Sequence, residues 1–277
     1  MARILIAGCG DVGSALGSTL AAAGHQVWGL RRRPASLPPA ITPVAGDLCD
    51  PSTLKQLPTG INVLYYTVAA SEFSDEAYRA AYIEGLGTLL AVLERDQLER
   101  LLFVSSTGVY AQTDGAWVDE SSATEPTGFS GRRLLEGEAL AAGSKVTSVA
   151  VRFAGIYGPG RRQLLDRVRS GTGCCETPPQ WTNRIHRDDC AGVLAHLLTL
   201  RSPAPVYIGV DDEPAPLCEV MDWIAAQLQL PAPARTTPQL RARGSNKRCS
   251  NRLLRTSGYQ FKYANYRQGY SKILQEY

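Results

Sequence analysis

The chain has 277 residues, 44% of them hydrophobic, with 29 basic and 26 acidic side chains and a formal net charge of +3. This is an ordinary globular composition, and the absence of an 18-residue apolar run and of a signal peptide predicts a cytoplasmic protein that enters no membrane. Seven cysteines without a Cys-x-x-Cys pattern, three histidines and scattered arginine pairs predict no disulfide framework, no metal site and no nucleic-acid surface.

Short runs rich in Val, Ile, Leu and Tyr alternate with amphipathic stretches in the first half of the chain. The apolar runs are nearly continuous, as in strands that are covered on both faces, and the alternation predicts βαβ units and a parallel sheet. We expect strands at 3–7, 26–30, 42–45, 62–67, 100–105 and 147–153, and helices at 11–23, 51–57, 75–95, 128–142, 187–198 and 217–228.

The pattern changes after about residue 157, where Gly, Pro, Arg and Cys interrupt it. We interpret residues 1–156 as a nucleotide-binding domain and 157–277 as a smaller substrate-binding cap, with segments at about 187–210 that return to the first domain. Cys174 and Cys175 lie in the cap region, and because adjacent cysteines seldom bond to each other we interpret them as loop filling.

The segment Gly8-Cys9-Gly10-Asp11-Val12-Gly13 matches G-x-G-x-x-G between a predicted strand and a predicted helix, which is the context that the motif requires. The first glycine permits a tight turn, the second lets a pyrophosphate approach the backbone, and the third lets helix and strand pack closely. The helix N-terminus offers N–H groups to the phosphates. The segment predicts an α/β fold of the Rossmann type, a doubly wound parallel sheet with a small C-terminal cap; a glycine-rich turn without a ligand is the alternative.

The end of the second predicted strand distinguishes the two nicotinamide cofactors. Sites for NAD usually place Asp or Glu there, on the ribose 2′-hydroxyl. Here the strand ends in Arg31, Arg32 and Arg33, and arginines suit a 2′-phosphate. We therefore predict NADP, with NAD possible, and assign Arg31 and Arg32 to the 2′-phosphate; a solvated basic turn is the alternative.

Further segments accompany the glycine motif, at 46–48, 67–70, 82–85, 103–110, 119–120 with Pro126, 152–159 and 185–189. Together they resemble the NAD-dependent epimerase/dehydratase family, the extended short-chain dehydrogenases/reductases. The resemblance implies that Asp47, with Leu48 beside it, lies at the adenine ring. It also implies that Val68, Ala69 and Ser105 lie beside the cofactor.

The catalytic pattern of that family is Tyr-x-x-x-Lys, in which tyrosine is the general acid/base and lysine lowers its pKa. The matching positions here are Ser130 and Leu134, and none of the five lysines follows a tyrosine by four residues. The resemblance leaves only the serine of the triad, assigned to Ser106. A serine without an activator is a poor proton donor near neutral pH, so the usual mechanism lacks its proton donor.

Four other side chains are candidates for the site. Tyr110, which follows the Ser106 turn, and Tyr82, at a position where the family usually has a pocket asparagine, could replace the missing tyrosine. The alternative is a structural role for Tyr110 in its family motif and packing of Tyr82 against the sheet. Arg184 could bind an anionic substrate group and His186 could be a base, although the resemblance favours a structural role for His186 before a helix.

Three functions stay open at this point. The first is an NADP-dependent reductase, epimerase or dehydratase that acts on a small polar or nucleotide-sugar-like substrate with an unusual proton donor. The second is a catalytically inactive NADP-binding regulator or redox sensor. The third is an isomerase-like enzyme that uses NADP structurally or not at all. The partner is then a small molecule, and the long predicted helices at 75–95 and 128–142 could pair in a homodimer.

Overall fold

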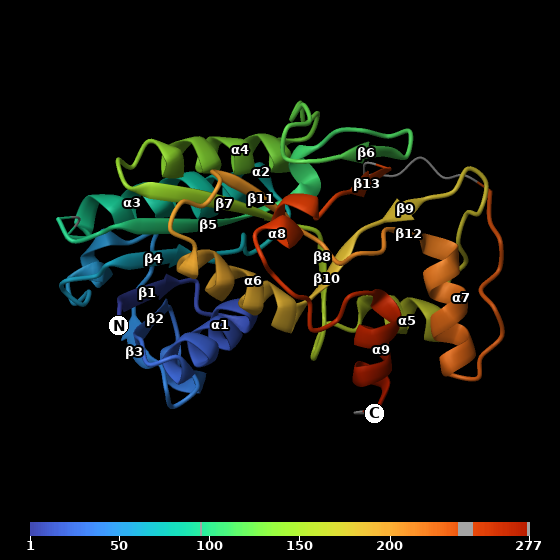
Figure 1. Ribbon diagram of the computed structural model, residues 1–277, viewed down its shortest axis with the longest axis horizontal. Coiled ribbons are helices and arrows are strands. Elements are labelled where there is room, and N and C mark those ends of the chain that lie inside the picture. The colour runs from blue at the N-terminus through green and yellow to red at the C-terminus, as the bar shows by residue number, and fades with distance from the viewer. Residues whose placement is uncertain (95, 238–245, 276–277) are drawn as a thin grey trace.

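A seven-stranded sheet with only parallel pairings forms the centre of the computed structural model, which describes residues 1–94, 96–237 and 246–275 (Figure 1). The strand order β11-β7-β5-β4-β1-β2-β3 reverses direction between β1 and β4. This confirms the predicted doubly wound α/β fold. The strands are β1 (Arg3–Ala7), β2 (Gln26–Arg31), β3 (Thr42–Ala45), β4 (Val63–Tyr66), β5 (Arg100–Ser106), β7 (Thr147–Phe153) and β11 (Val206–Gly209).

Helices cover both faces of the sheet, which explains the continuous apolar character of the strands. On one face α1 (Asp11–Ala22) and α6 (Arg187–Thr199) bury Leu16 and Leu194 against Ile4 and Ile6 of β1. On the other face lie α3 (Gly85–Val92) and α4 (Phe129–Ala142), and the core there includes Leu86. Figure 1 shows these two layers above and below the strands.

The helix expected at 75–95 consists of three pieces, and its last residue, Arg95, lies outside the described residues. The pieces are α2 (Asp75–Arg79), a π turn η3 (Ala80–Glu84) and α3. Ser74 caps the first piece, because its hydroxyl accepts the N–H of Ala77 at 3.1 Å. The π turn is the part that sequence periodicity did not predict, and it lies at the site described below.

The prediction of a helix at 51–57 is wrong. The structure has only a 3-10 turn, η2 (Pro51–Leu54), in which Asp50 accepts the N–H of Ser52 at 3.0 Å. Leu54 is its only buried residue, so the segment has no apolar stripe that would stabilise a longer helix. Two other short turns are η1 (Pro34–Ser36) and η4 (Thr107–Val109).

The cap is built from short strand pairs and small helices beside the sheet (Figure 1). The pairs are β8 (Gly155–Tyr157) with β10 (Arg184–His186), β9 (Trp181–Thr182) with β12 (Ala215–Pro216), and β6 (Ala116–Val118) with β13 (Lys247–Cys249). The helices are α5 (Gln163–Arg169), α7 (Leu217–Gln227), α8 (Arg252–Thr256) and α9 (Tyr266–Leu274). Within the described ranges, no helix is long and apolar enough to cross a membrane.

One interpretation of the cap cysteines needs correction. Cys174 does not merely fill a loop, because it forms a disulfide with Cys218, the second residue of α7. Both are buried in the apolar core of the cap together with Val168 and Met221. The partner is 44 residues away in sequence, so spacing alone gave no signal for this pair.

Candidate functional site

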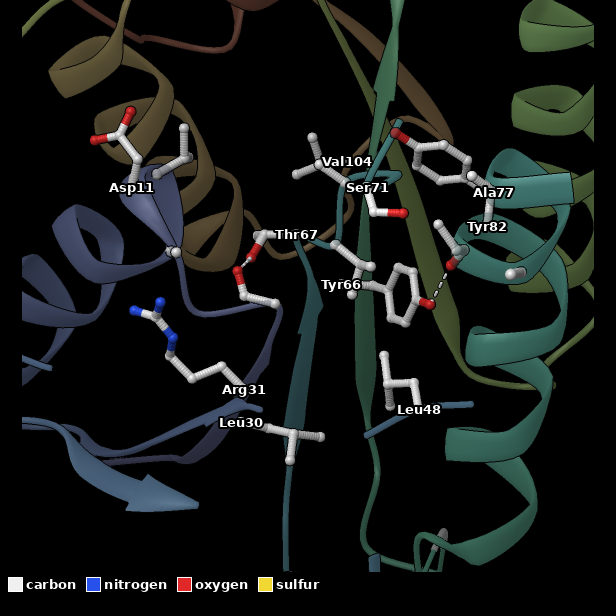
Figure 2. Close-up of a pocket in the computed structure, with 18 of the residues that line it drawn as sticks. Asp11, Leu30, Arg31, Leu48, Tyr66, Thr67, Ser71, Ala77, Tyr82 and Val104 are labelled. Carbon is white, nitrogen blue, oxygen red and sulfur yellow. Dashed lines mark hydrogen bonds between the residues drawn. The ribbon is translucent and has the colours of Figure 1, made fainter. Parts of the chain in front are cut away.

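A cavity of about 830 Å³ lies at the carboxyl ends of the central strands, where the strand order reverses. Open α/β sheets bind their ligands at this position, and the volume suits a small molecule or cofactor. Figure 2 shows Asp11 and Arg31 on one side of the cavity, Tyr82 on the other, and Thr67 and Val104 between them. All the cofactor residues expected from the sequence line this cavity except Cys9: Gly8, Gly10, Asp11, Val12, Gly13, Arg31, Arg32, Asp47, Leu48, Val68, Ala69 and Ser105.

Two glycines of the loop are required by close packing. Gly8 has φ of +77°, and a Cβ there would lie 2.6 Å from the Cα of Val68. A Cβ on Gly13 would lie 3.0 Å from the hydroxyl of Thr67, whose Oγ1 is also 3.0 Å from the carbonyl oxygens of Ala7 and Gly8. The turn therefore holds strand, loop and helix together in a form that larger side chains would disrupt.

Gly10 leaves space for a ligand instead. A Cβ on this residue would have only the carbonyl oxygen of Gly8 nearby, at 3.7 Å. Gly10 is also the N-cap of α1, and no side chain caps this helix end. The first N–H groups of the helix and its positive dipole thus face an open part of the cavity, which fits a diphosphate.

The exception, Cys9, points away from the cavity. Its side chain is fully buried, and a Cβ on Gly29 of β2 would lie only 2.8 Å from its sulfur. Burial raises the pKa of the thiol. Cys9 therefore belongs to the core of the sheet, and only its backbone belongs to the loop.

One end of the cavity is basic. Arg31, Arg32 and Arg33 all line it, and Arg33 was not assigned from the sequence. Arg31 is half-buried and donates from Nη1 to the carbonyl of Cys9 at 3.4 Å, whereas the other two are exposed. The nearby Asp47 carboxylate accepts the N–H of Cys49 at 3.0 Å. This end has the cationic groups that a phosphate requires.

The opposite end carries hydroxyls in an apolar setting. Ser106, Tyr82 and the apolar Leu134 all line the cavity. Ser106 closes its own turn, because its Oγ accepts the N–H of Gly108 at 3.0 Å. Burial raises the pKa of Tyr82, so its phenol is protonated at neutral pH. Figure 2 shows the Tyr82 ring extending from its helix toward the side where Val104 and Ser71 lie.

The π turn that carries Tyr82 is fixed by a strand residue. The Tyr66 hydroxyl at the end of β4 donates to the carbonyl of Ala81 (Figure 2). A Cβ on Gly85 would lie 2.8 Å from that hydroxyl, so glycine makes room for the bond. A π turn holds one residue more than an α-helical turn and often marks a functional site.

The other two hydroxyl candidates do not reach the cavity. Ser130 lies in the first turn of α4, and Tyr110 is buried; neither is among the described residues that line the cavity. The Tyr110 hydroxyl accepts a hydrogen bond from Arg152 Nη1 at 2.8 Å, and burial raises the pKa of Tyr110 to about 12. Arg152 in turn forms a bidentate pair with Glu138, with N–O distances of 3.0 and 2.7 Å.

The same carboxylate accepts the Ser105 hydroxyl at 2.5 Å. Glu138 thereby joins α4 to the ends of β5 and β7, directly behind the cavity wall. Sequence reasoning missed Glu138, and its spacing eight residues after Ser130 gave no physical signal by itself. The network is buried, since the side chains of Arg152 and Glu138 are 7% and 10% exposed.

Arg184 and His186, the two ends of β10, are buried and are not among the described residues that line the cavity. The Nδ1 of His186 accepts the N–H of Asp188 at 3.1 Å and so caps α6. Arg184 donates to the Thr182 hydroxyl and lies over the Tyr266 ring. Among the residues that the structure describes, no group of three or more His, Cys, Asp or Glu side chains could hold a metal ion.

Comparisons with known proteins agree with this architecture. The model of the NAD dependent epimerase/dehydratase family matches residues 4–171. A structure from Methylobacillus flagellatus, named as a NAD-dependent epimerase/dehydratase, is 37% identical with a TM-score of 0.83 and covers 99% of this chain and 98% of its own. Protein YeeZ of Escherichia coli K12 is 30% identical over 75% of this chain and 77% of its own length. A 2-alkyl-3-oxoalkanoate reductase of Stenotrophomonas maltophilia is 26% identical over 83% of this chain and 76% of its own length. The chain therefore belongs to the NAD-dependent epimerase/dehydratase family.

Proposed function

We propose that the chain binds NADP(H) along this cavity and reduces a small carbonyl substrate at the end away from the arginines. The observation that carries the proposal is that one cavity holds three kinds of group. It is lined by the arginines after β2, by the glycine loop and by the hydroxyls of Ser106 and Tyr82, and Arg31 and Tyr82 lie on opposite sides of it (Figure 2). Family membership and a reductase among the relatives support a nicotinamide cofactor and a redox reaction.

The preference for NADP(H) rests on the end of β2. Arg31 and Arg32 line the cavity there, at the place where NAD sites usually carry an acidic residue. Guanidinium groups form charge-assisted hydrogen bonds with phosphate, which favours a cofactor with a 2′-phosphate. Asp47 and Leu48, which line the cavity on the next loop, are proposed to lie at the adenine ring.

The proton for the carbonyl oxygen is proposed to come from Tyr82. When bound, the cofactor supplies hydride to a carbonyl carbon, and the protein must then protonate the oxygen. Tyr82 lines the cavity and is protonated at neutral pH, with the Ala70 backbone as a hydrogen-bond partner, whereas Tyr110 is buried outside the cavity lining beside Arg152. Ser106 is proposed to orient the carbonyl. Leu134 stands at the position of the family's lysine, so no ammonium group there lowers the pKa of the phenol. We therefore expect little change of rate with pH across the neutral range.

The substrate is proposed to be an apolar ketone or keto acid rather than a nucleotide sugar. The side chains around Tyr82 and Ser106 in the cavity wall are largely apolar, as with Leu134, Val104 and Ile156. The arginines that line the described cavity belong instead to the β2 end and to the region of the glycine loop. The reductase relative named for 2-alkyl-3-oxoalkanoates acts on substrates of this chemical kind.

The test is an NADPH oxidation assay with a panel of 3-oxo acids, aromatic ketones and UDP-glucose. We expect turnover with an apolar carbonyl, and Tyr82→Phe should lower kcat about 100-fold or more. Tyr78→Phe is the matched control, because Tyr78 packs against Tyr82 with ring centroids 5.4 Å apart but does not line the cavity. Tight NADPH binding without turnover of any probe would favour the regulator instead, and equal losses in both variants would contradict the role of Tyr82.

A further inference from the structure

Arg161 reaches the cofactor cavity from the cap. It follows β8 in a tight turn, in which its N–H donates to the carbonyl of Gly158 at 3.0 Å. Its side chain is one-third exposed, and it lines the cavity although it lies 150 residues from the glycine loop. Because Arg161 comes from the cap, a contact with the glycine loop or with a ligand is needed to hold its side chain at the cavity.

Asp11 supplies the anchor. Its Oδ2 accepts the Nε of Arg161 at 2.7 Å, and its Oδ1 accepts the Nη1 of Arg187 at 2.7 Å. Asp11 is the first residue of α1, so its carboxylate lies beside the N–H groups that fit a diphosphate. A lone carboxylate would repel that anion, and the ion pair with Arg161 neutralises the carboxylate.

The two arginines differ in how many of their guanidinium nitrogens are already hydrogen-bonded. Arg187 is bonded a second time, from Nε to Asp188 at 2.8 Å, and does not line the cavity. Arg161 uses only Nε, and in the described part of the chain its terminal nitrogens make no hydrogen bond or ion pair. The free edge of the Arg161 guanidinium is thus available at the glycine loop, held in place through its other edge.

We propose that Arg161 is a binding residue for the pyrophosphate of the dinucleotide, with Nε fixed by Asp11 and the terminal nitrogens donating to phosphate oxygens. This rests on the proposed dinucleotide site. Since Arg161 belongs to the cap and Asp11 to the Rossmann core, the same contact joins the two parts of the protein over the bound cofactor. Charge-assisted bonds of this kind would account for a large share of the affinity for both NADP(H) and NAD(H).

The test compares three ligands, NADPH, NADH and 2′-AMP, by titration of the full chain and its variants. NADPH and NADH both contain the pyrophosphate, whereas 2′-AMP carries the phosphate that Arg31 and Arg32 would bind but no pyrophosphate. We expect Arg161→Gln to weaken NADPH and NADH by the same factor, about 10- to 100-fold. Binding of 2′-AMP should stay within about twofold, which also shows that the variant is folded.

Arg187→Gln is the matched control, because it removes one charge and one ion pair of Asp11 without touching the cavity. It should weaken the dinucleotides less than about threefold. Wild-type affinity of Arg161→Gln for both dinucleotides would overturn the assignment of Arg161, and so would an equal loss in Arg187→Gln. Failure of the wild type to bind either dinucleotide would overturn the proposed function together with this inference.

Discussion

Glu138 is the residue whose removal should most clearly disturb the wall behind the cavity. It binds Arg152 through two nitrogens and accepts the Ser105 hydroxyl, and both members of the ion pair are nearly buried. In Glu138→Ala the guanidinium stays buried with Tyr110 as its remaining side-chain partner. The cost of such an unpaired buried charge is about 3–5 kcal/mol of unfolding free energy.

The measurement is urea unfolding followed by circular dichroism, with thermal unfolding in parallel. A loss of about 3–5 kcal/mol corresponds to a fall in Tm of roughly 6–20 °C for a chain of this size. Because Ser105 and Ser106 end the strand that Glu138 holds, NADPH affinity should fall as well. Glu138→Gln keeps an acceptor for both partners and should lose less.

The matched control lies two residues away on the same helix. Glu136 pairs with Arg133 at 2.8 Å, but its side chain is 48% exposed, so Glu136→Ala should cost less than about 1 kcal/mol. A Glu138→Ala variant as stable as Glu136→Ala would refute the reasoning, because it would mean that the buried guanidinium finds another partner or is hydrated at little cost.

Three further predictions concern the cofactor site and pH. Arg31→Ala should weaken NADPH about 10- to 100-fold and NADH less than about threefold in fluorescence titrations, and equal losses would contradict its role at the 2′-phosphate. Gly8→Ala should abolish dinucleotide binding, since a Cβ would lie 2.6 Å from Val68 at a φ of +77°; calorimetry showing wild-type affinity would contradict this. Burial raises the pKa of Asp211 to about 7, above its value of about 3.9 in the unfolded chain, so the carboxyl is neutral only in the folded protein between these values. The free energy of unfolding should therefore fall by up to about 4 kcal/mol as pH rises from 4 through 7, and Asp211→Asn should flatten this fall in urea titrations; an equally steep fall would show that another group is responsible.

The sequence allowed prediction of those parts of the fold and site that depend on neighbours along the chain. The strand, the glycine loop and α1 are adjacent, so Gly8, Gly10 and Gly13 could be assigned their roles from spacing alone. The same holds for Arg31, which ends β2 beside that loop. Local patterns failed where one buried residue was too little to extend a helix, as after Pro51.

Features that depend on distant segments could not be predicted in this way. Arg161 meets Asp11 across 150 residues, and Cys174 meets Cys218 across 44. The sequence left both Tyr82 and Tyr110 as candidates, because both lie within family-like segments. The structure separates them. Tyr82 lies on the π turn and lines the cavity, whereas Tyr110 lies in the core, where its hydroxyl accepts a hydrogen bond from Arg152.

The most direct test of the central claim, that this cavity is an NADP(H) site, is calorimetric titration of the wild-type chain with NADPH and with NADH at one ionic strength. We predict that NADPH binds at least about tenfold more tightly, because Arg31 and Arg32 lie where its 2′-phosphate would be bound. Equal affinities, or tighter binding of NADH, would contradict the assignment of these arginines and the choice of cofactor.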